Sequence, residues 1–490
     1  MSPTGHQASR RMGLLRNAGW VMLGNGLPML IGLLAIPLLI DRLGTERFGL
    51  LTIVWAIAGY FSLFDLGLGR TLTKLISDHL VQGEGEAPGQ LVWTALCLLL
   101  GLGVLGGMIL FAAVPLVVPS LQLLPVLDAE ARLAFCFLAL SIPLVVVSSA
   151  LVGILEAHHR FREVARVRMA VGSLNFLVPI LLAPVWPSLP VLTAGIIGLR
   201  ALSLILFWRL ARKVEPVLRS PEFADPAWLR PLLSFGGWLT VSNIVSPLMV
   251  YFDRFVIGAV AGASAVAYYV PPFEVMSRLQ MLPQSLMTAA FPALTSSHQR
   301  DAERGVLLFA YTAQLGFLLI LPPLALIFLF SHELLAFWLG SEFAVNSSGV
   351  SRWMVLGWLV NMLARPAFTW LQSLGRSDLP AKLHCVELPV FAALLYFGIL
   401  YFGIEGAAAA WSLRCLLDSL ILNELARRCS PQLGKLVARI HLTIFLVLVG
   451  AFAIFQLEGF AVRLVFLLCL CLAAGRAGIV ASHQWRGLPR

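Results

Sequence analysis

Charged side chains lie within long apolar runs of this sequence, and their types and spacing suit them to binding a ligand. Glu274 and Arg278 are four residues apart, and Arg414 and Asp418 repeat that spacing. Residues four apart lie on one face of a helix, so each pair can form an ion pair. A charge inside an apolar membrane segment is costly and is functional by default. Each pair is interpreted either as a structural clamp or as part of a transport site.

Two further arginines, Arg200 and Arg365, have no acidic partner nearby in the sequence. A guanidinium presents several N–H donors in one plane and binds a phosphate group through two of them. We therefore predict that Arg200, Arg365 and Arg278 line an internal cavity. Three other polar residues complete the predicted cavity: Glu274, Asn25 and Asn243.

The stretch from Phe61 to Ser77 places a carboxylate, Asp65, shortly before the glycines Gly67 and Gly69. At the rise of an α-helix, Asp65 falls near the inner edge of the hydrocarbon layer. Two roles remain open, pairing with a nearby cation such as Arg70, or forming an inner gate where the glycines permit close packing or bending. The residues predicted to have gate or structural roles are Asp65, Arg70, Asp253, Arg254, Arg414 and Asp418.

These residues must be positioned by membrane-spanning helices, because 59% of the chain is hydrophobic and only 12% is charged. A soluble core cannot absorb that much apolar surface. The runs are too long, and lack the alternation, for membrane strands. We predict an all-α polytopic membrane protein with about fourteen transmembrane helices. The predicted spans are 17–40, 47–77, 91–118, 131–155, 164–185, 189–210, 231–260, 264–294, 306–330, 351–374, 381–403, 405–425, 438–457 and 462–482.

The basic residues predict the orientation, because cytoplasmic loops retain Lys and Arg. Most of the 35 Lys and Arg residues fall in segments that are cytoplasmic if the N-terminus is inside. We therefore predict that both termini are cytoplasmic. The net charge of +10 reflects this asymmetry and contact with lipid headgroups, so nucleic acid is not an expected partner.

A weak internal repeat divides the predicted spans into two halves. An offset of 218 residues aligns NAGWVMLGN at 17–25 with FGGWLTVSN at 235–243. Each half then holds six spans, so the halves enter the membrane in the same direction, which is a transporter architecture. The predicted domains are a six-helix lobe at 1–228, a second at 229–430 and two additional helices at 431–490.

Several motifs predict no chemistry. The GxGxxG match at Gly101, Gly103 and Gly106 lies inside an apolar span, which favours helix packing over dinucleotide binding. The seven cysteines form no CxxC pair, and the sequence predicts no metal site or cofactor. No predicted outer loop is long enough for a catalytic domain, so the chain is not expected to be an enzyme.

The sequence resembles a known family over most of residues 12–425. The segment GTERFGL at 44–50, followed by FDLGLG at 64–69, resembles a conserved segment of the bacterial O-antigen and exopolysaccharide flippases. DRFVIG at 253–258, with AVAYY at 265–269, is similar to the matching segment of their second half. The stretch from LPQ at 282–284 to FP at 291–292 is similar to the end of their eighth helix.

This resemblance implies the multidrug/oligosaccharidyl-lipid/polysaccharide exporter superfamily. It implies two six-helix lobes around a central cavity, and alternating access that moves undecaprenyl-diphosphate-linked oligosaccharides across the inner membrane. The predicted cavity arginines would receive the diphosphate. Coupling to a proton, sodium or the membrane potential stays open, and a polysaccharide polymerase and a chain-length regulator are the expected partners.

Two alternatives remain within the same superfamily. A lipid II flippase also fits fourteen spans, but it predicts a tighter set of cavity arginines in the first two spans. A cation-coupled multidrug exporter predicts acidic residues at membrane depth, whereas the charges without partners in this sequence are basic. We therefore expect a lipid-linked oligosaccharide flippase.

Overall fold

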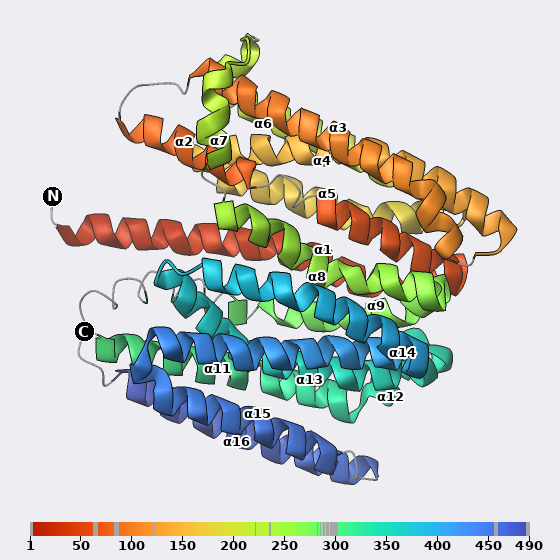
Figure 1. Cartoon of the computed structure of the whole chain (residues 1–490), viewed down its shortest axis with the longest axis vertical. Coiled ribbons are helices and arrows are strands. Elements are labelled where there is room, and N and C mark those ends of the chain that lie inside the picture. Colours follow the sequence, from red (N-terminus) through yellow and green to blue (C-terminus); the bar gives the residue numbers. More distant parts are fainter. Residues whose placement is uncertain are drawn as a thin grey trace. The chain divides into compact units, whose positions relative to one another are not determined.

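The computed structural model of the chain consists of α-helices joined by short connections (Figure 1). It describes residues 3–61, 67–82, 88–121, 123–220, 222–234, 237–281, 302–454 and 459–486, with single residues between 283 and 294. No strand occurs in these ranges. The predicted residues Asn25, Asn243 and Asp65 lie outside the side chains that the structure describes.

The helices gather into two compact units, Met1–Ala267 and Tyr268–Arg490. The first unit holds α1 (Pro3–Phe61), α2 (Leu68–Gln82), α3 (Gly89–Ser120), α4 (Pro125–Ala157), α5 (Phe161–Leu182), α6 (Leu189–Val214), η1 (Pro216–Arg219), η2 (Pro226–Trp228), α7 (Leu229–Ser234) and α8 (Gly237–Ala261). Helix α9 (Ala263–Leu279) begins in the first unit and continues into the second. The second unit also holds α11 (Ala302–Leu329), α12 (Ser331–Leu339), α13 (Ser341–Ser373), α14 (Asp378–Cys429), η3 (Pro431–Leu433), α15 (Gly434–Ile454) and α16 (Phe460–Arg486).

Two long helices each correspond to two predicted spans. Helix α1 is interrupted at Gly44, with φ 74° and ψ 167°, and α14 is interrupted at Gly403, with φ 58° and ψ −144°. A positive φ is tolerated by glycine, which lacks the Cβ atom that would clash. Both interruptions lie where the sequence predicts a boundary between spans. Each helix therefore turns back on itself without a long loop.

Nine helices in the described ranges are long and apolar enough to cross a membrane. This number treats α14 as one span of 52 residues. The all-α polytopic class is therefore confirmed. The lobe boundary near residue 228 and the sequence repeat stay predictions.

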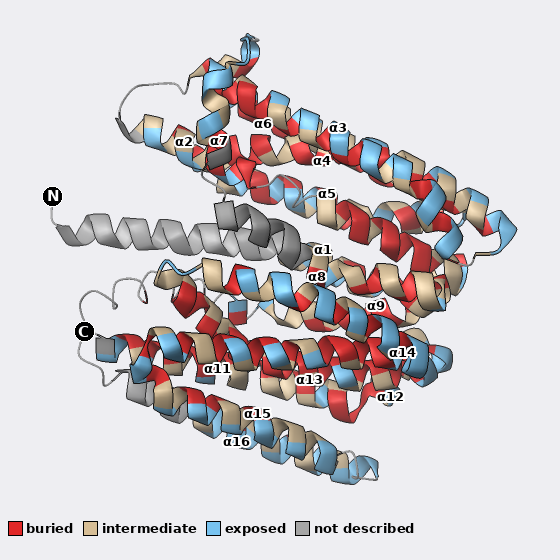
Figure 2. Cartoon of the chain, viewed as in Figure 1, coloured by how far each residue is buried: buried red, intermediate tan, exposed pale blue. Residues whose placement is uncertain are grey.

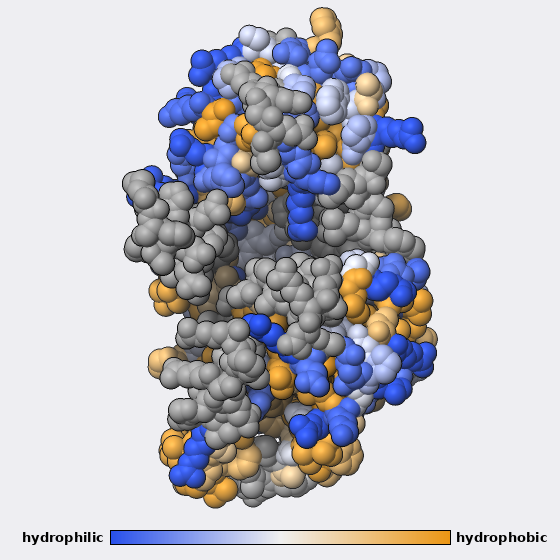
Figure 3. All heavy atoms as spheres, turned by 90° about the vertical axis from the view of Figure 1, so that its left-hand side faces the viewer, coloured by the Kyte–Doolittle hydropathy of each residue, from blue (hydrophilic) through white to orange (hydrophobic). Residues whose placement is uncertain are grey.

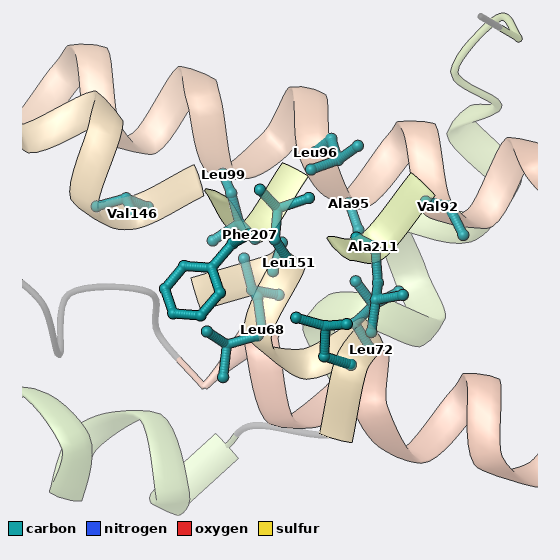
Figure 4. Close-up of a cluster of buried hydrophobic side chains, with 14 of the residues drawn as sticks. Leu68, Leu72, Val92, Ala95, Leu96, Leu99, Val146, Leu151, Phe207 and Ala211 are labelled. Atoms are coloured by element: carbon teal, nitrogen blue, oxygen red, sulfur yellow. The ribbon is translucent and has the colours of Figure 1, made fainter. Parts of the chain in front are cut away.

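The core of the first unit lies where α2, α3, α4 and α6 meet. Leu68 and Leu72 of α2 pack with Leu99 of α3, Leu151 of α4 and Phe207 of α6 (Figure 4). All five side chains are buried. Within a membrane such close packing supplies the dispersion energy that holds helices together.

Contacts between connecting segments show which helix ends lie at the same end of the first unit. At one end, His158 after α4 contacts Glu215 after α6 at 2.9 Å, and Trp93 at the start of α3 donates to the Val217 carbonyl. At the other end, Arg47 after the bend of α1 forms two hydrogen bonds with Glu130 of α4. Segments predicted to share a membrane side therefore lie together.

Exposed basic residues mark the end of this unit that is predicted to be cytoplasmic. Arg70, Lys74, Arg160, Arg212 and Lys213 are exposed there. Hydrophilic side chains crowd this end of the first unit in the upper part of Figure 3. The arrangement agrees with the charge asymmetry, while the side that faces the cytoplasm stays a prediction.

The two last helices of the second unit bury little of their surface. In the most apolar stretch of each helix, 17% of the residues of α15 and 6% of those of α16 are buried, against 56% for α4. Figure 2 shows few buried residues on α15 and α16. Arg463 of α16 holds this pair to the unit, because it donates to the Leu329 carbonyl at 2.7 Å and pairs with Glu333 at 2.9 Å. The remaining apolar surface of these helices is suited to contact lipid.

The segment around Gly67 bends and packs closely, as the glycines predict. Helix α1 ends at Phe61, α2 begins at Leu68, and Gly67 has φ 76°. A Cβ atom on Gly153 of α4 would lie 2.5 Å from the Gly69 carbonyl oxygen, so α2 and α4 touch through glycine backbones. Arg70 is exposed, and the gate role of this segment stays a prediction.

The small residues of the third span do pack helices together, with one exception. A Cβ atom on Gly103 would lie 2.6 Å from the Pro143 Cα atom of α4, and one on Gly106 would lie 3.2 Å from the Phe61 ring. Gly101 has nothing within 4 Å of such an atom. The packing interpretation therefore holds for Gly103 and Gly106 and is wrong for Gly101.

This difference predicts opposite effects of two neighbouring substitutions. Gly103→Ala is expected to lower the unfolding free energy by about 1–3 kcal/mol, because backbone atoms must separate to admit the methyl group. Gly101→Ala is the matched control and should be neutral or stabilising by up to about 1 kcal/mol, since alanine favours a helix. Thermal unfolding of the purified protein, followed by size-exclusion chromatography, measures both. Equal melting temperatures for the two variants would contradict the packing.

Candidate functional site

Of the cavity residues predicted in the first unit, only Arg200 has a side chain that the structure describes. Arg200 is on α6, and its Nε atom is buried without a hydrogen-bond partner. Asp253 and Arg254 are buried on α8, where the Asp253 carboxylate accepts the Arg254 backbone N–H at 2.8 Å. The Arg254 guanidinium also lies 5.2 Å from the centre of the Tyr251 ring. These contacts suit a structural role for Asp253 and Arg254 on one turn of α8.

The second unit contains the first predicted ion pair. Arg278 Nη2 lies 2.9 Å from Glu274 Oε2 on α9, as the four-residue spacing predicts. Both side chains are largely buried, with 17% and 25% exposed. Each charge is therefore offset by the other within the helix bundle.

Two hydrogen bonds one helical turn apart join α13 to the chain that follows α9. Gln280 donates to Asn361 at 3.0 Å, and Arg365 Nη1 donates to Gln284 Oε1 at 3.3 Å. The four-residue spacing on both sides places these contacts on facing helical surfaces. Gln284 thus holds one end of the Arg365 guanidinium.

A compact cluster of ionisable side chains lies on α14. His384 and Glu387 come from the arm before Gly403, and Arg414 and Asp418 come from the arm after it. Asp418 Oδ1 lies 3.5 Å from His384 Nε2, and Arg414 Nη1 lies 3.9 Å from Glu387 Oε2. Arg365 of α13 interacts electrostatically with Asp418 and Arg414. We call these five residues the α14 cluster.

The bend of α14 brings the two halves of the cluster together. Close contact of its arms depends on Gly398 and Gly406, since a Cβ atom on Gly406 would lie 1.9 Å from the Gly398 carbonyl oxygen. The two arms therefore approach through glycine backbones near the bend, and their polar residues meet further along. Helix α13 lies beside α14 and adds Arg365 (Figure 1).

Aromatic rings pack beside the α14 cluster. Trp358 of α13 and Trp411 of α14 have ring centres 5.0 Å apart, and Phe273 of α9 contacts both. The Arg414 guanidinium lies 5.6 Å from the Phe391 ring centre and 6.0 Å from that of Trp411. Such cation–π contacts stabilise a guanidinium away from water.

This geometry corrects two interpretations of the sequence. Arg414 and Asp418 were expected to pair with each other, but each contacts a residue of the opposite arm, Glu387 and His384 respectively. The charges at membrane depth that have no partner in sequence were expected to be basic. In the structure, the carboxylates of Glu387 and Asp418 lie beside Arg365 and Arg414. The deep charges of the second unit therefore include carboxylates, the residue type that cation coupling requires.

Sequence reasoning missed His384 and Glu387. Both lie in a predicted span, three residues apart and therefore on one face of a helix. That spacing was a usable signal. Their contact with Asp418 depends on the folding back of α14, which no local pattern predicts.

The α14 cluster has the residue types of a metal site but not a favourable charge. One ligand atom each from His384, Glu387 and Asp418 lies within 4.8 Å of the others. Arg414 and Arg365 are close to these carboxylates and oppose a divalent cation. The structure therefore gives no support for a metal ion there.

The long apolar helices define a class, the multi-pass α-helical membrane proteins. An inward-facing MATE family transporter of the MOP superfamily matches with a TM-score of 0.71 and 15% identity, over 85% of this chain and 99% of that one. An outward-facing MATE family transporter matches with a TM-score of 0.61 and 16% identity, over 87% and 95%. Identities this low show the fold alone.

Sequence comparison supplies the family. The model of the family described as "Polysaccharide biosynthesis protein" matches residues 14–298, more than half of the chain. A Shigella flexneri protein named "Putative O-antigen transporter" is 32% identical over 86% of this chain and 99% of its own length. A Haloferax volcanii protein named "Probable low-salt glycan biosynthesis flippase Agl15" is 25% identical over 44% of this chain and 45% of its own. The chain belongs to the polysaccharide biosynthesis protein family.

Proposed function

We propose that this protein is a flippase that moves undecaprenyl-diphosphate-linked oligosaccharide units across the bacterial inner membrane. The product would be a surface polysaccharide, such as O-antigen, exopolysaccharide or capsule. The observation that carries the proposal is the 32% identity to the Shigella flexneri transporter along 99% of that protein's length. A relative named as a glycan biosynthesis flippase supports the same class of cargo.

The mechanism would be alternating access. The same fold occurs in transporters solved in inward-facing and in outward-facing conformations. A diphosphate is recognised best by guanidinium groups, which bind it through paired N–H donors. Arg365, Arg278 and Arg200 are the proposed ligands, and Glu274, Asn25 and Asn243 would line the path of the sugars.

The polyprenyl chain would remain in an apolar environment. The second unit has an apolar cavity of about 310 Å³ between α11, α13, α15 and α16. Leu359, Leu446 and Phe466 are among its lining residues. This cavity supports two separate binding regions: the arginines would bind the diphosphate head group, and the last helices would contact the polyprenyl chain.

Both termini would be cytoplasmic, because the basic loops gather on one side. A polysaccharide polymerase and a chain-length regulator would consume the flipped units. The protein itself would catalyse no covalent step, so no residue has a catalytic role.

Deletion of the gene tests this function in the cell. Lipid-linked repeat units should accumulate on the inner leaflet and surface polysaccharide should disappear, with both restored by the wild-type gene. Leaflet location is measured by the access of an added glycan-modifying enzyme to spheroplasts. Arrest of peptidoglycan synthesis would support the lipid II alternative instead, and drug sensitivity with normal polysaccharide would support the multidrug alternative.

A further inference from the structure

The carboxylates of the α14 cluster are buried, and three of their four oxygens have no hydrogen-bond donor among the described residues. Glu387 is 7% exposed and Asp418 is 5% exposed. Both oxygens of Glu387, and Oδ1 of Asp418, have no hydrogen-bond partner in the structure. A buried carboxylate without donors is costly, and in most proteins such groups are satisfied. These oxygens therefore need a donor that the described side chains do not supply.

We propose that Glu387 and Asp418, with His384, form a proton-binding site in which one exchangeable proton is held between the two arms of α14. A proton taken from water forms an O–H bond on one carboxylate. On Asp418 that O–H group faces the His384 imidazole, because Asp418 Oδ1 lies 3.5 Å from His384 Nε2. Glu387 offers an oxygen within 4.8 Å of both groups, so a small approach of the two arms lets the carboxylates share the proton. The proton supplies the missing donor and removes the repulsion between two close negative charges.

The surroundings favour a proton over a metal cation. Hard cations take several oxygen ligands, usually six or more for Ca²⁺ and six for Mg²⁺. In the described structure the cluster supplies carboxylate oxygens from two residues only, and the guanidinium of Arg414 lies 3.9 Å from one of them. A proton needs no coordination shell and adds a single charge. The two arginines therefore oppose a multivalent cation more strongly than a singly charged proton.

The groups that face the site come from two helices. Arg365 of α13 and Arg414 and His384 of α14 lie near Glu387 or Asp418, and the buried Cys415 thiol adjoins the same two carboxylates. The ring of Phe368 on α13 stacks on His384 with centres 6.3 Å apart. Helix α15, which also packs on α14, carries Lys435, Arg439 and His441.

Protonation at this place would act on the packing of α14. The two arms carry opposite halves of the site and meet at the Gly403 bend, so gain or loss of the proton changes the attraction between them. A ligand that binds one packing better shifts the equilibrium toward it. The link to export rests on the proposed function, whereas the binding of the proton does not.

Infrared difference spectroscopy of the full-length protein in nanodiscs tests the site directly. The buffer is switched between alkaline and acidic pH in potassium salt, and the carbonyl stretch of a protonated carboxylic acid is recorded. Wild-type protein should show a reversible band that is lost in Glu387→Gln. Glu424→Gln removes an exposed carboxylate of the same helix, paired with Arg427 at 2.6 Å, and should leave the band unchanged.

Three results would overturn the proposal. They are a wild-type spectrum without the band, a band that persists in both Glu387→Gln and Asp418→Asn, or a band abolished by replacing potassium with sodium at fixed pH. If Glu387→Gln does not fold, Asp418→Asn provides the same comparison. A band that behaves as expected, in a protein that does not flip lipid-linked glycans, would keep the proton site and refute the proposed function.

Discussion

Replacing Arg365 by alanine is expected to abolish surface-polysaccharide export while leaving the protein folded in the membrane. Arg365 is anchored by Gln284 at 3.3 Å, and in the proposed site its other N–H donors would bind a phosphate group. Charge-assisted hydrogen bonds to phosphate contribute about 1.5–3 kcal/mol each, so losing two should lower transport by about a hundredfold or more. The measurement is the amount of polysaccharide at the cell surface, normalised to the protein in the membrane.

Two variants separate phosphate recognition from packing. Arg365→Lys keeps the charge but cannot bind two phosphate oxygens in the same plane, so it should restore only a part of the export. Arg376→Ala removes an exposed arginine that pairs with Asp378 at 3.0 Å, and export should remain normal. Normal export by Arg365→Ala would remove this residue from the cavity.

Replacing Arg414 by alanine is expected to destabilise the protein more than any exposed substitution on α14. The change leaves Glu387 and Asp418 buried without the nearer cation of the α14 cluster. Removing one member of a buried ion pair costs about 3–5 kcal/mol, because the other charge remains in a medium of low dielectric constant. Thermal unfolding in detergent, followed by size-exclusion chromatography, gives the change in melting temperature.

A double variant tests the cause of that loss. Arg414→Ala with Glu387→Ala should be more stable than Arg414→Ala alone, because the uncompensated carboxylate is gone. Arg427→Ala is the control, since this exposed arginine on α14 pairs with Glu424 and exposed pairs contribute about 0–1 kcal/mol. A double variant no more stable than the single one would show that Arg414 acts through packing on Phe391 and Trp411 instead.

Hydropathy and glycine positions predicted most of the long helices, although the predicted span 47–77 is divided between α1, which ends at Phe61, and α2, which begins at Leu68. Apolar runs predict the spans because a helix must satisfy its own backbone in lipid. The bends at Gly44 and Gly403 lie at predicted span boundaries, and the Glu274–Arg278 contact follows from its four-residue spacing. These features are local, so a single sequence carries them.

The α14 cluster could be predicted only in part. Arg414, Asp418 and Arg365 stand out as charges in apolar runs, but their partners do not. Glu387 reaches Arg414 only because α14 folds back at Gly403, and that contact spans 27 residues of chain. Non-local contacts of this kind depend on the packing of whole helices. The prediction from the sequence therefore gave the buried part of the second unit too much positive charge.

Flipping by purified protein in liposomes tests the central claim most directly. Undecaprenyl-diphosphate-linked oligosaccharide with a labelled sugar is incorporated with the protein, and the label exposed to an impermeant quencher is followed over time. Wild-type protein should give transfer between leaflets that protein-free liposomes and Arg365→Ala lack. Equal transfer in wild-type and protein-free liposomes, with the protein shown to be folded, would contradict the assignment as a flippase of lipid-linked oligosaccharides.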